Sequence, residues 1–420
     1  MGRLFILLGI TCTLGITPIQ ASGLAALPGA DMAGLWQYLE QNSAELNAAR
    51  LETSAAEQRA EATGALPEPS VRIEWQDINQ PNGVTLNPVQ VAAVKYSVLQ
   101  PIPGWGKRDA LKQTAIANAN VAKAQQQTVS ADLRAQVRLY FAQYYRTFHA
   151  MQLNEELKTF ATSASKLAQS RYELGQGGQQ EWVKAQLEEA VLQSDGYTLQ
   201  ADNRKAQARL NALLNRACDA PLAAPQFLPE LPSASVLDET QLQIRLRASS
   251  PQLSRQTALS ASAQGEVEMA RKNQTPDFIV AVAPVQRGNG VSSWDAMLEF
   301  TIPLQLSSHG AHRHEADERL SASQAREQAL GQNLSAELSE HKAGLAASTE
   351  QLQLIRQRSL PLIEMAFQSA LSAYQNGRLD YATLWQVRRE VQRNKLDELD
   401  ALTNQQIHLA EIERLLGEVL

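Results

Sequence analysis

The spacing of hydrophobic residues switches between a helical and a strand period along the chain. Residues 31–64 carry leucines at helical spacing, whereas residues 70–77 and 90–100 alternate apolar and polar side chains and predict the two strands of a hairpin. From residue 108 to residue 172 no proline occurs, and apolar residues recur at steps of three and four. This run predicts one helix of ~65 residues, or ~100 Å, which is a rod packed against neighbouring helices rather than part of a compact domain.

The same order of helix, hairpin and long helix returns in the second half of the chain. We expect its long helix to be bent at Pro361, because proline removes a backbone hydrogen bond. The fold class is therefore mainly α with a small β part, built from a duplicated helix–β-hairpin–long helix hairpin unit. The remaining expected elements are helices at about 180–215, 238–272 and 310–374, strands at about 277–285 and 294–304, and a final helix to 418.

The turns between the long helices carry the clearest sign of duplication. The two turn segments align at an offset of 202 residues, which places Tyr172 on Tyr374 and Gly175 on Gly377. Each glycine is expected to end a helix in the left-handed conformation. A long internal repeat of this kind indicates a duplicated architecture.

The N-terminus has the pattern of a secretory signal peptide, in which Arg3 precedes an apolar run and Ala21 offers a cleavage site. The run is too short for a membrane-spanning helix. Cys12 lies within it, but the preceding residues fit a bacterial lipoprotein box poorly. Cys218 is the other cysteine, so no intrachain disulfide is expected in the mature chain. The expected divisions are a signal peptide (1–21), a first repeat (22–215, tip near 173–180), a proline-rich connector (216–237) and a second repeat (238–420, tip near 375–382).

Composition narrows the possible functions. The chain is only 5% aromatic and 44% hydrophobic, with abundant Ala, Gln, Leu and Glu, which is a composition typical of long helices rather than of compact α/β domains. The formal net charge of −6 gives a nucleic-acid partner no electrostatic support. The sequence has no phosphate-binding glycine loop and no nucleophile–base pattern, and His149 and His408 are isolated on helices. We therefore expect neither an enzyme nor a cofactor.

Four strands of this length and alternation are typical of a membrane barrel, but four strands cannot close one. About eight strands make the smallest closed barrel, and open edges are not tolerated in lipid. Two chains would supply about eight strands and a barrel filled by side chains, whereas three would supply about twelve. This reasoning favours a trimer in which polar strand faces line the bore and apolar faces meet lipid. Trp75, Tyr96 and Trp294 form either an aromatic girdle or ordinary sheet packing.

The signal peptide, the duplicated Tyr-x-x-Gly turns and the segment QPIPGWGKR at 100–108 resemble the TolC family of outer-membrane efflux proteins. The resemblance spans essentially the whole mature chain. It implies a homotrimer with a 12-stranded outer-membrane β-barrel on an α-helical periplasmic tunnel. It also implies a periplasmic adaptor (a membrane fusion protein) and an inner-membrane pump, of the RND type, as partners.

In that family the Tyr-x-x-Gly turns form the far tip of the tunnel, where the adaptor docks. The alternative is that the glycines only end helices. Family members often carry acidic residues at the positions of Thr383 and Gln386, which this chain lacks, and Asp380 lies one turn earlier. The residues that the resemblance assigns to the tip are Tyr172, Gly175, Glu181, Trp182, Tyr374, Gly377, Asp380, Thr383 and Leu384.

Three of the six histidines, His309, His312 and His314, follow the fourth expected strand. On a helix the first two share a face, whereas His314 lies well round from His312. A metal site needs ligands that converge, so the two interpretations are a weak candidate metal site and a polar helix start. This cluster, with the Gly-Lys-Arg after the second strand, resembles the CzcC-like heavy-metal efflux branch.

The sequence therefore predicts the outer-membrane channel of a tripartite efflux system, a passive exit duct for solutes such as heavy-metal cations. One alternative is the outer-membrane duct of a type I protein secretion system. The other is a secreted coiled-coil structural or adhesive protein. The strands distinguish the channel from the secreted coiled-coil protein. A barrel needs a continuous apolar outer band, whereas a soluble hairpin needs only one buried patch.

Overall fold

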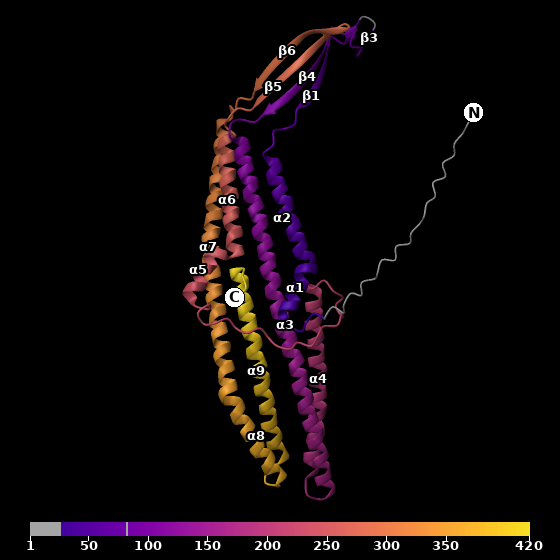
Figure 1. Ribbon diagram of the computed structural model, residues 1–420, viewed down its shortest axis with the longest axis vertical. Coiled ribbons are helices and arrows are strands. Elements are labelled where there is room, and N and C mark those ends of the chain that lie inside the picture. The colour runs from indigo at the N-terminus through magenta and orange to yellow at the C-terminus, as the bar shows by residue number, and fades with distance from the viewer. Residues whose placement is uncertain (1–26, 81–82) are drawn as a thin grey trace, which may run out of the picture.

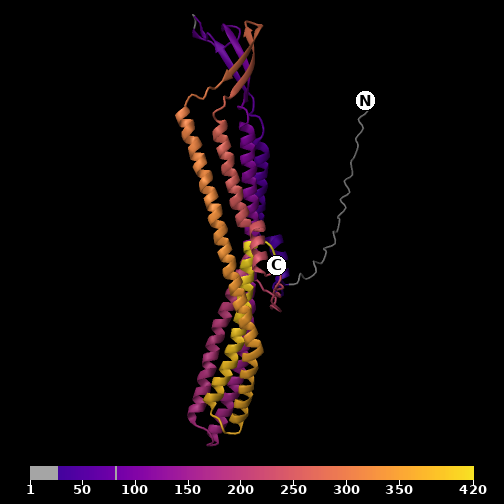
Figure 2. The same ribbon diagram turned by 90° about the vertical axis from the view of Figure 1, so that its left-hand side faces the viewer.

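A computed structural model describes residues 27–80 and 83–420. The expected signal peptide at 1–21 and Cys12 lie outside these residues. The described chain is a long rod of helices with a small sheet at one end and two helical turns at the other (Figures 1 and 2). None of the helices in the described ranges is both long and apolar enough to cross a membrane.

The duplicated unit predicted from the sequence is confirmed, since a helix pair, two main strands and a long helical hairpin occur twice. The first copy consists of α1 (Met32–Asn42), α2 (Ala44–Thr63), β1 (Ser70–Gln76), the short strands β2 (Asn79–Gln80) and β3 (Gly83–Val84), β4 (Ala93–Ile102), α3 (Lys107–Glu173) and α4 (Gln179–Leu213). The second consists of α5 (Glu239–Ser249), α6 (Pro251–Lys272), β5 (Phe278–Arg287), β6 (Gly290–Phe300), α7 (Leu306–Leu354), a π-helical turn (Ile355–Ser359), α8 (Leu360–Gln375) and α9 (Tyr381–Leu416).

The single helix expected at 31–64 is wrong, because the structure divides it into α1 and α2 at Ser43. The Ser43 hydroxyl accepts a hydrogen bond from the backbone N–H of Leu46 at 3.2 Å and caps α2. The corresponding helix of the second copy is also divided, at Ser250. Pro251 disfavours the helical conformation at the residue before it and begins α6 as a first-turn proline.

The range expected for the fourth main strand, 294–304, is also wrong, because β6 runs from Gly290 to Phe300. Arg287 pairs with Gly290, so a turn of only two residues joins β5 to β6. Gly288 has φ +64°, the left-handed conformation that such a tight turn requires. Pairing therefore begins four residues earlier than the alternation alone indicated.

The interruption expected at Pro361 takes the form of a π-helical turn. The backbone N–H of Leu360 bonds to the carbonyl oxygen of Ile355, five residues earlier. Pro361 has no N–H to continue the α-helical pattern. The long helix begins at Leu306, before the expected start at 310, and continues beyond this turn as α8.

The four main strands form one antiparallel sheet in the order β1-β4-β5-β6, and its two faces differ in polarity. On the polar face the Lys95 ammonium lies 3.1 Å from the Asp295 carboxylate. The strand register places a set of exposed apolar side chains on the other face. These are Val71, Ile73 and Trp75 of β1, Val98 of β4, Val280 and Val282 of β5, and Trp294, Leu298 and Phe300 of β6. We call this set the apolar band.

Within the described residues, the helices pack through three apolar clusters, and one buried ion pair joins the two copies. Nη2 of Arg138 in α3 lies 3.1 Å from Oε2 of Glu413 in α9, and the two side chains are 6% and 8% exposed. Burial raises the pKa of the Glu413 carboxyl, and the charge of Arg138 opposes that shift. Two further nitrogens of the Arg138 guanidinium, Nε and Nη1, are buried without a hydrogen-bond partner among the described residues. Such a pair adds little net stability to the fold, but removing either partner leaves the other charge buried without compensation, which is strongly destabilising.

Candidate functional site

Both long hairpins turn at a glycine in the left-handed conformation, as the sequence predicted. Gly175 has φ +69° and Gly377 has φ +71°. The residue after each glycine donates its backbone N–H to the carbonyl five residues earlier: Gln176 to Arg171 at 2.8 Å, and Arg378 to Ala373 at 2.9 Å. The two turns are therefore the same Schellman motif, which satisfies the last carbonyls of α3 and α8.

The two turns lie side by side at the end of the rod opposite the sheet (Figures 1 and 2). A buried cluster joins them, with Leu157 and Ala161 from α3, Ala185 from α4, and Tyr381 and Trp385 from α9. The ring planes of Tyr381 and Trp385 are stacked with centroids 6.2 Å apart. We call this end of the rod the tip.

The aromatic centre of the tip is a feature that sequence reasoning missed. Tyr381 and Trp385 are four residues apart on one helix face, which was the available signal. Burial is the main cause that raises the pKa of Tyr381 above its ordinary value. The hydroxyls of Tyr374 and Tyr381 and the indole nitrogen of Trp385 are buried without hydrogen-bond partners in the described part of the chain.

The predicted tip residues divide into an exposed set and a buried set. Tyr374 and Leu384 are each 1% exposed and belong to the tip cluster, so they support the surface from beneath. The guanidinium of Arg171 lies 5.1 Å from the ring centroid of Tyr374 and links the two turns. The exposed or half-buried set consists of Tyr172, Gly175, Glu181, Trp182, Gly377, Asp380 and Thr383.

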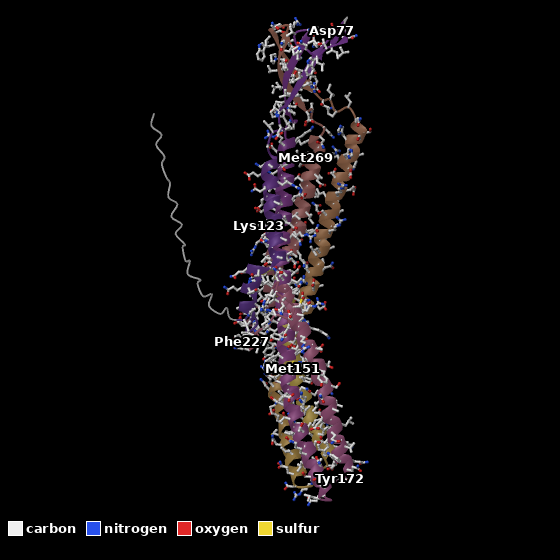
Figure 3. The ribbon with its side chains drawn as sticks, turned by 90° about the vertical axis from the view of Figure 1, so that its right-hand side faces the viewer. Asp77, Lys123, Met151, Tyr172, Phe227 and Met269 are labelled. Atoms are coloured by element: carbon white, nitrogen blue, oxygen red, sulfur yellow. The ribbon has the colours of Figure 1, made fainter. Side chains whose placement is uncertain are left out.

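Within the exposed set, Tyr172 and Trp182 close the first hairpin by stacking their rings, with centroids 6.0 Å apart and an interplanar angle of 19°. Figure 3 shows Tyr172 at the far end of the rod from Asp77. The carboxylate of Asp380 accepts the backbone N–H of Thr383 at 2.7 Å and caps α9. This bond holds the pKa of Asp380 below its ordinary value and keeps a negative charge at the tip.

The three histidines singled out in the sequence lie at the start of α7 and do not converge. His312 and His314 are exposed, and the ring of His312 lies 3.5 Å from the Glu315 carboxylate, one turn further along the helix. Among the described residues they belong to no group of three possible metal ligands. The polar helix start is the interpretation that the geometry supports.

The expectation that His408 is isolated is wrong. Its Nδ1 atom on α9 lies 3.3 Å from Nδ1 of His341 on α7. Glu337 and Glu411 flank the two rings, and Arg414 bonds to both carboxylates at 2.6 Å. Burial lowers the pKa of His408, and the neighbouring His341 adds to the shift. Sequence reasoning missed this cluster because the two histidines are 67 residues apart.

Comparison with known proteins relates most of the chain to one family. The profile of the family described as outer membrane efflux protein matches residues 35–216 and 244–418. The cobalt-zinc-cadmium resistance protein CzcC of Cupriavidus metallidurans is 25% identical over 329 residues, which cover 76% of this chain and 75% of that protein.

Solved structures share the fold at low sequence identity. A crystal structure of CusC matches with a TM-score of 0.80 at 16% identity, and the match covers 93% of each chain. That structure comes from work on the conformational changes that accompany folding and transmembrane channel formation of CusC. The outer-membrane channel OprN matches with a TM-score of 0.79 at 17% identity, covering 92% of this chain and 89% of that one.

Alanine at Gly175 or Gly377 should lower the free energy of unfolding of the tip hairpins by about 1 kcal/mol each, because a Cβ disfavours the left-handed conformation. Open space surrounds Gly175, so no clash contributes there. Hydrogen exchange of the tip and urea unfolding measure the effect.

The matched control is Gly178→Ser in the same loop. Gly178 has φ −82° and precedes α4 without a side-chain cap, so serine should leave stability unchanged or raise it. Equal losses at all three glycines would contradict the conformational argument.

Proposed function

Because this chain belongs to the outer membrane efflux protein family, we propose that three copies form the exit duct of a tripartite efflux system. The match covers both repeats and confirms the resemblance to TolC-type outer-membrane channels seen in the sequence. The family is one of channels rather than enzymes. Solutes would diffuse through a water-filled bore, and an inner-membrane pump joined by a periplasmic adaptor would supply the energy.

The observation that carries this proposal is the apolar band on a sheet with two open edges. Val71, Trp294 and Leu298 are 70%, 69% and 65% exposed, although apolar side chains of this size normally lie inside a soluble protein. Within the described residues β1 and β6 each pair on one side only. Lipid outside the band and pairing of β1 with β6 of the next chain satisfy both features, and three copies supply about twelve strands.

The polar face of the sheet supports the assignment of the bore. Arg72, Glu74, Lys95 and Asp295 alternate along their strands with the residues of the band, so they point to the opposite side. A closed barrel with the band outside would place these charged side chains in its lumen, beside small and apolar residues of β5. A secreted coiled-coil protein in water would instead leave the band exposed.

We assign adaptor docking to the tip. Gly175, Gly377 and Asp380 lie on the outer surface of two identical turns held together by the tip cluster. Because the main chain is bare at each glycine, a partner can approach the backbone closely. The exposed Asp380 carboxylate adds a negative charge that a basic side chain of the adaptor could meet.

Heavy-metal cations are the proposed cargo, and an RND-type pump is the proposed partner. The support is the relationship to CzcC, whose name records resistance to cobalt, zinc and cadmium. A duct for protein secretion would have the same architecture, so cargo needs its own test. Export of metal from cells that carry the intact system, compared with cells lacking this chain, distinguishes the two.

Purified mature protein in detergent should run as a trimer and form ion-conducting channels in planar bilayers. A heat-sensitive trimer that conducts supports the shared barrel. A species that is soluble without detergent and does not conduct would overturn the duct and favour the extracellular coiled coil.

Arginine at Gly175 or Gly377 should abolish most export while the protein still trimerises and conducts, because bulk and charge then cover the docking turn. Gly178→Ser in the same loop should keep export and serves as the control. Full export by trimeric Gly175→Arg and Gly377→Arg channels would show that the adaptor does not dock on these turns.

A further inference from the structure

We propose that Glu337 and His341 of α7, with His408 and Glu411 of α9, form a binding site for one divalent transition-metal ion in each chain. The four residues belong to α7 and α9, which Figure 1 shows running side by side in the middle part of the rod. The site is separate from both the tip and the sheet.

Helical spacing brings the four side chains together in pairs. Glu337 and His341 are four residues apart on α7, whereas His408 and Glu411 are three apart on α9, so each pair shares a helix face. One ligand atom each from Glu337, His341 and Glu411 lies within 4.8 Å of the others. Sites built from Glu and His on facing helices are a recurrent way for a bundle to hold metal ions.

The separation of the two imidazoles fits a common ion. Their Nδ1 atoms are 3.3 Å apart. Two ligands of a tetrahedral ion with bonds of ~2.1 Å lie ~3.4 Å from each other. This separation is that of two ligands of one ion, and His408 would have to move closer to the group formed by Glu337, His341 and Glu411 to join it as a fourth ligand.

A glycine makes room for the second ring. A Cβ atom at Gly344 of α7 would lie 2.4 Å from both Cε1 and Nε2 of His408, closer than any real contact. Gly344 has an ordinary helical position, so its missing side chain serves the neighbouring imidazole rather than a turn. The buried residues Leu338, Leu345 and Ile412, which neighbour this group in sequence, belong to one apolar cluster that packs α7 against α9.

Arg414 orients the carboxylates and leaves them able to bind. Arg414 donates hydrogen bonds to Oε1 of Glu337 and to Oε2 of Glu411. The other oxygen of each carboxylate is not hydrogen-bonded to Arg414 and is the one proposed to bind the ion. Arg414 also lies 3.9 Å from Asp132 of α3. Two carboxylates against one guanidinium leave a net negative charge beside two imidazoles, which favours a divalent cation.

The ligand chemistry selects the class of metal. Imidazole nitrogen with carboxylate oxygen suits zinc, cobalt, nickel and copper better than magnesium or calcium, which prefer all-oxygen sites. A bound ion would join α7 to α9 directly. The site is defined by its own ligands and does not rest on the proposed metal cargo, so either proposal can fail alone.

The test is calorimetric titration of Zn²⁺ into the chelator-treated, detergent-purified mature protein, with the visible absorption of bound Co²⁺ as a second readout. We expect one high-affinity ion per chain and a Co²⁺ spectrum of nitrogen–oxygen ligation. His341→Gln and His408→Gln should each weaken Zn²⁺ binding by at least ~10-fold. Loss of a residue that only hydrogen-bonds to a metal ligand already costs ~10-fold in affinity, and loss of a ligand itself should cost no less.

Three further variants make the result specific. Gly344→Ala keeps every ligand but displaces the His408 ring, and should also weaken binding by ~10-fold. His149→Gln, whose ring bonds to Gln152 instead, is the matched control and should leave affinity unchanged. Thermal unfolding without metal checks that each variant is folded. Unchanged Zn²⁺ affinity in folded His341→Gln and His408→Gln proteins overturns the proposal. It is also overturned if Zn²⁺ binding is lost on joint replacement of His309, His312 and His314 and in none of the other variants.

Discussion

Within the described residues, the four-stranded sheet has unpaired edges at β1 and β6 and an apolar outer face, and these two features constrain the rest of the molecule. Backbone N–H and C=O groups on an open edge need partners, and in lipid no water supplies them. The apolar band is unfavourable in water, and unpaired edges at β1 and β6 would be unfavourable in lipid for a lone sheet. A closed assembly of several chains meets both demands. In the proposed assembly the helices below the sheet would pack around the same axis.

The duplication explains how one chain supplies two equivalent parts of such an assembly. Both hairpins end in the same hydrogen-bonded turn, and the tip cluster makes the two turns one surface. Elsewhere the copies differ. Among the described residues, the π-helical turn before Pro361 interrupts the second long helix, whereas α3 is continuous. The histidine cluster also belongs to the second copy, so the repeats share a shape but carry different chemistry.

Local pattern predicted the fold well, because helices, strands and glycine turns are determined by neighbours in sequence. Gly175 and Gly377 took the expected conformation for this reason. Element boundaries failed where a single side chain decided them, as the cap at Ser43 did. Long-range contacts could not be predicted, since no local period brings His341 to His408 or shows that Tyr374 is buried. The tip was thus foreseen at its turns and missed in its aromatic centre, and the separate histidine pair between α7 and α9 was missed altogether.

Disulfide crosslinking between chains tests the shared sheet most directly. A chain with the exposed Cys218 replaced by serine would carry one cysteine in β1, at Val71 or Ile73, and one in β6, scanned from Trp294 to Phe300. Oxidation in outer-membrane preparations should give covalent trimers at the positions in register, and chains with either cysteine alone should give none. Crosslinks that form only within single chains, or none at any register, would contradict a barrel closed by β1 and β6 of neighbouring chains.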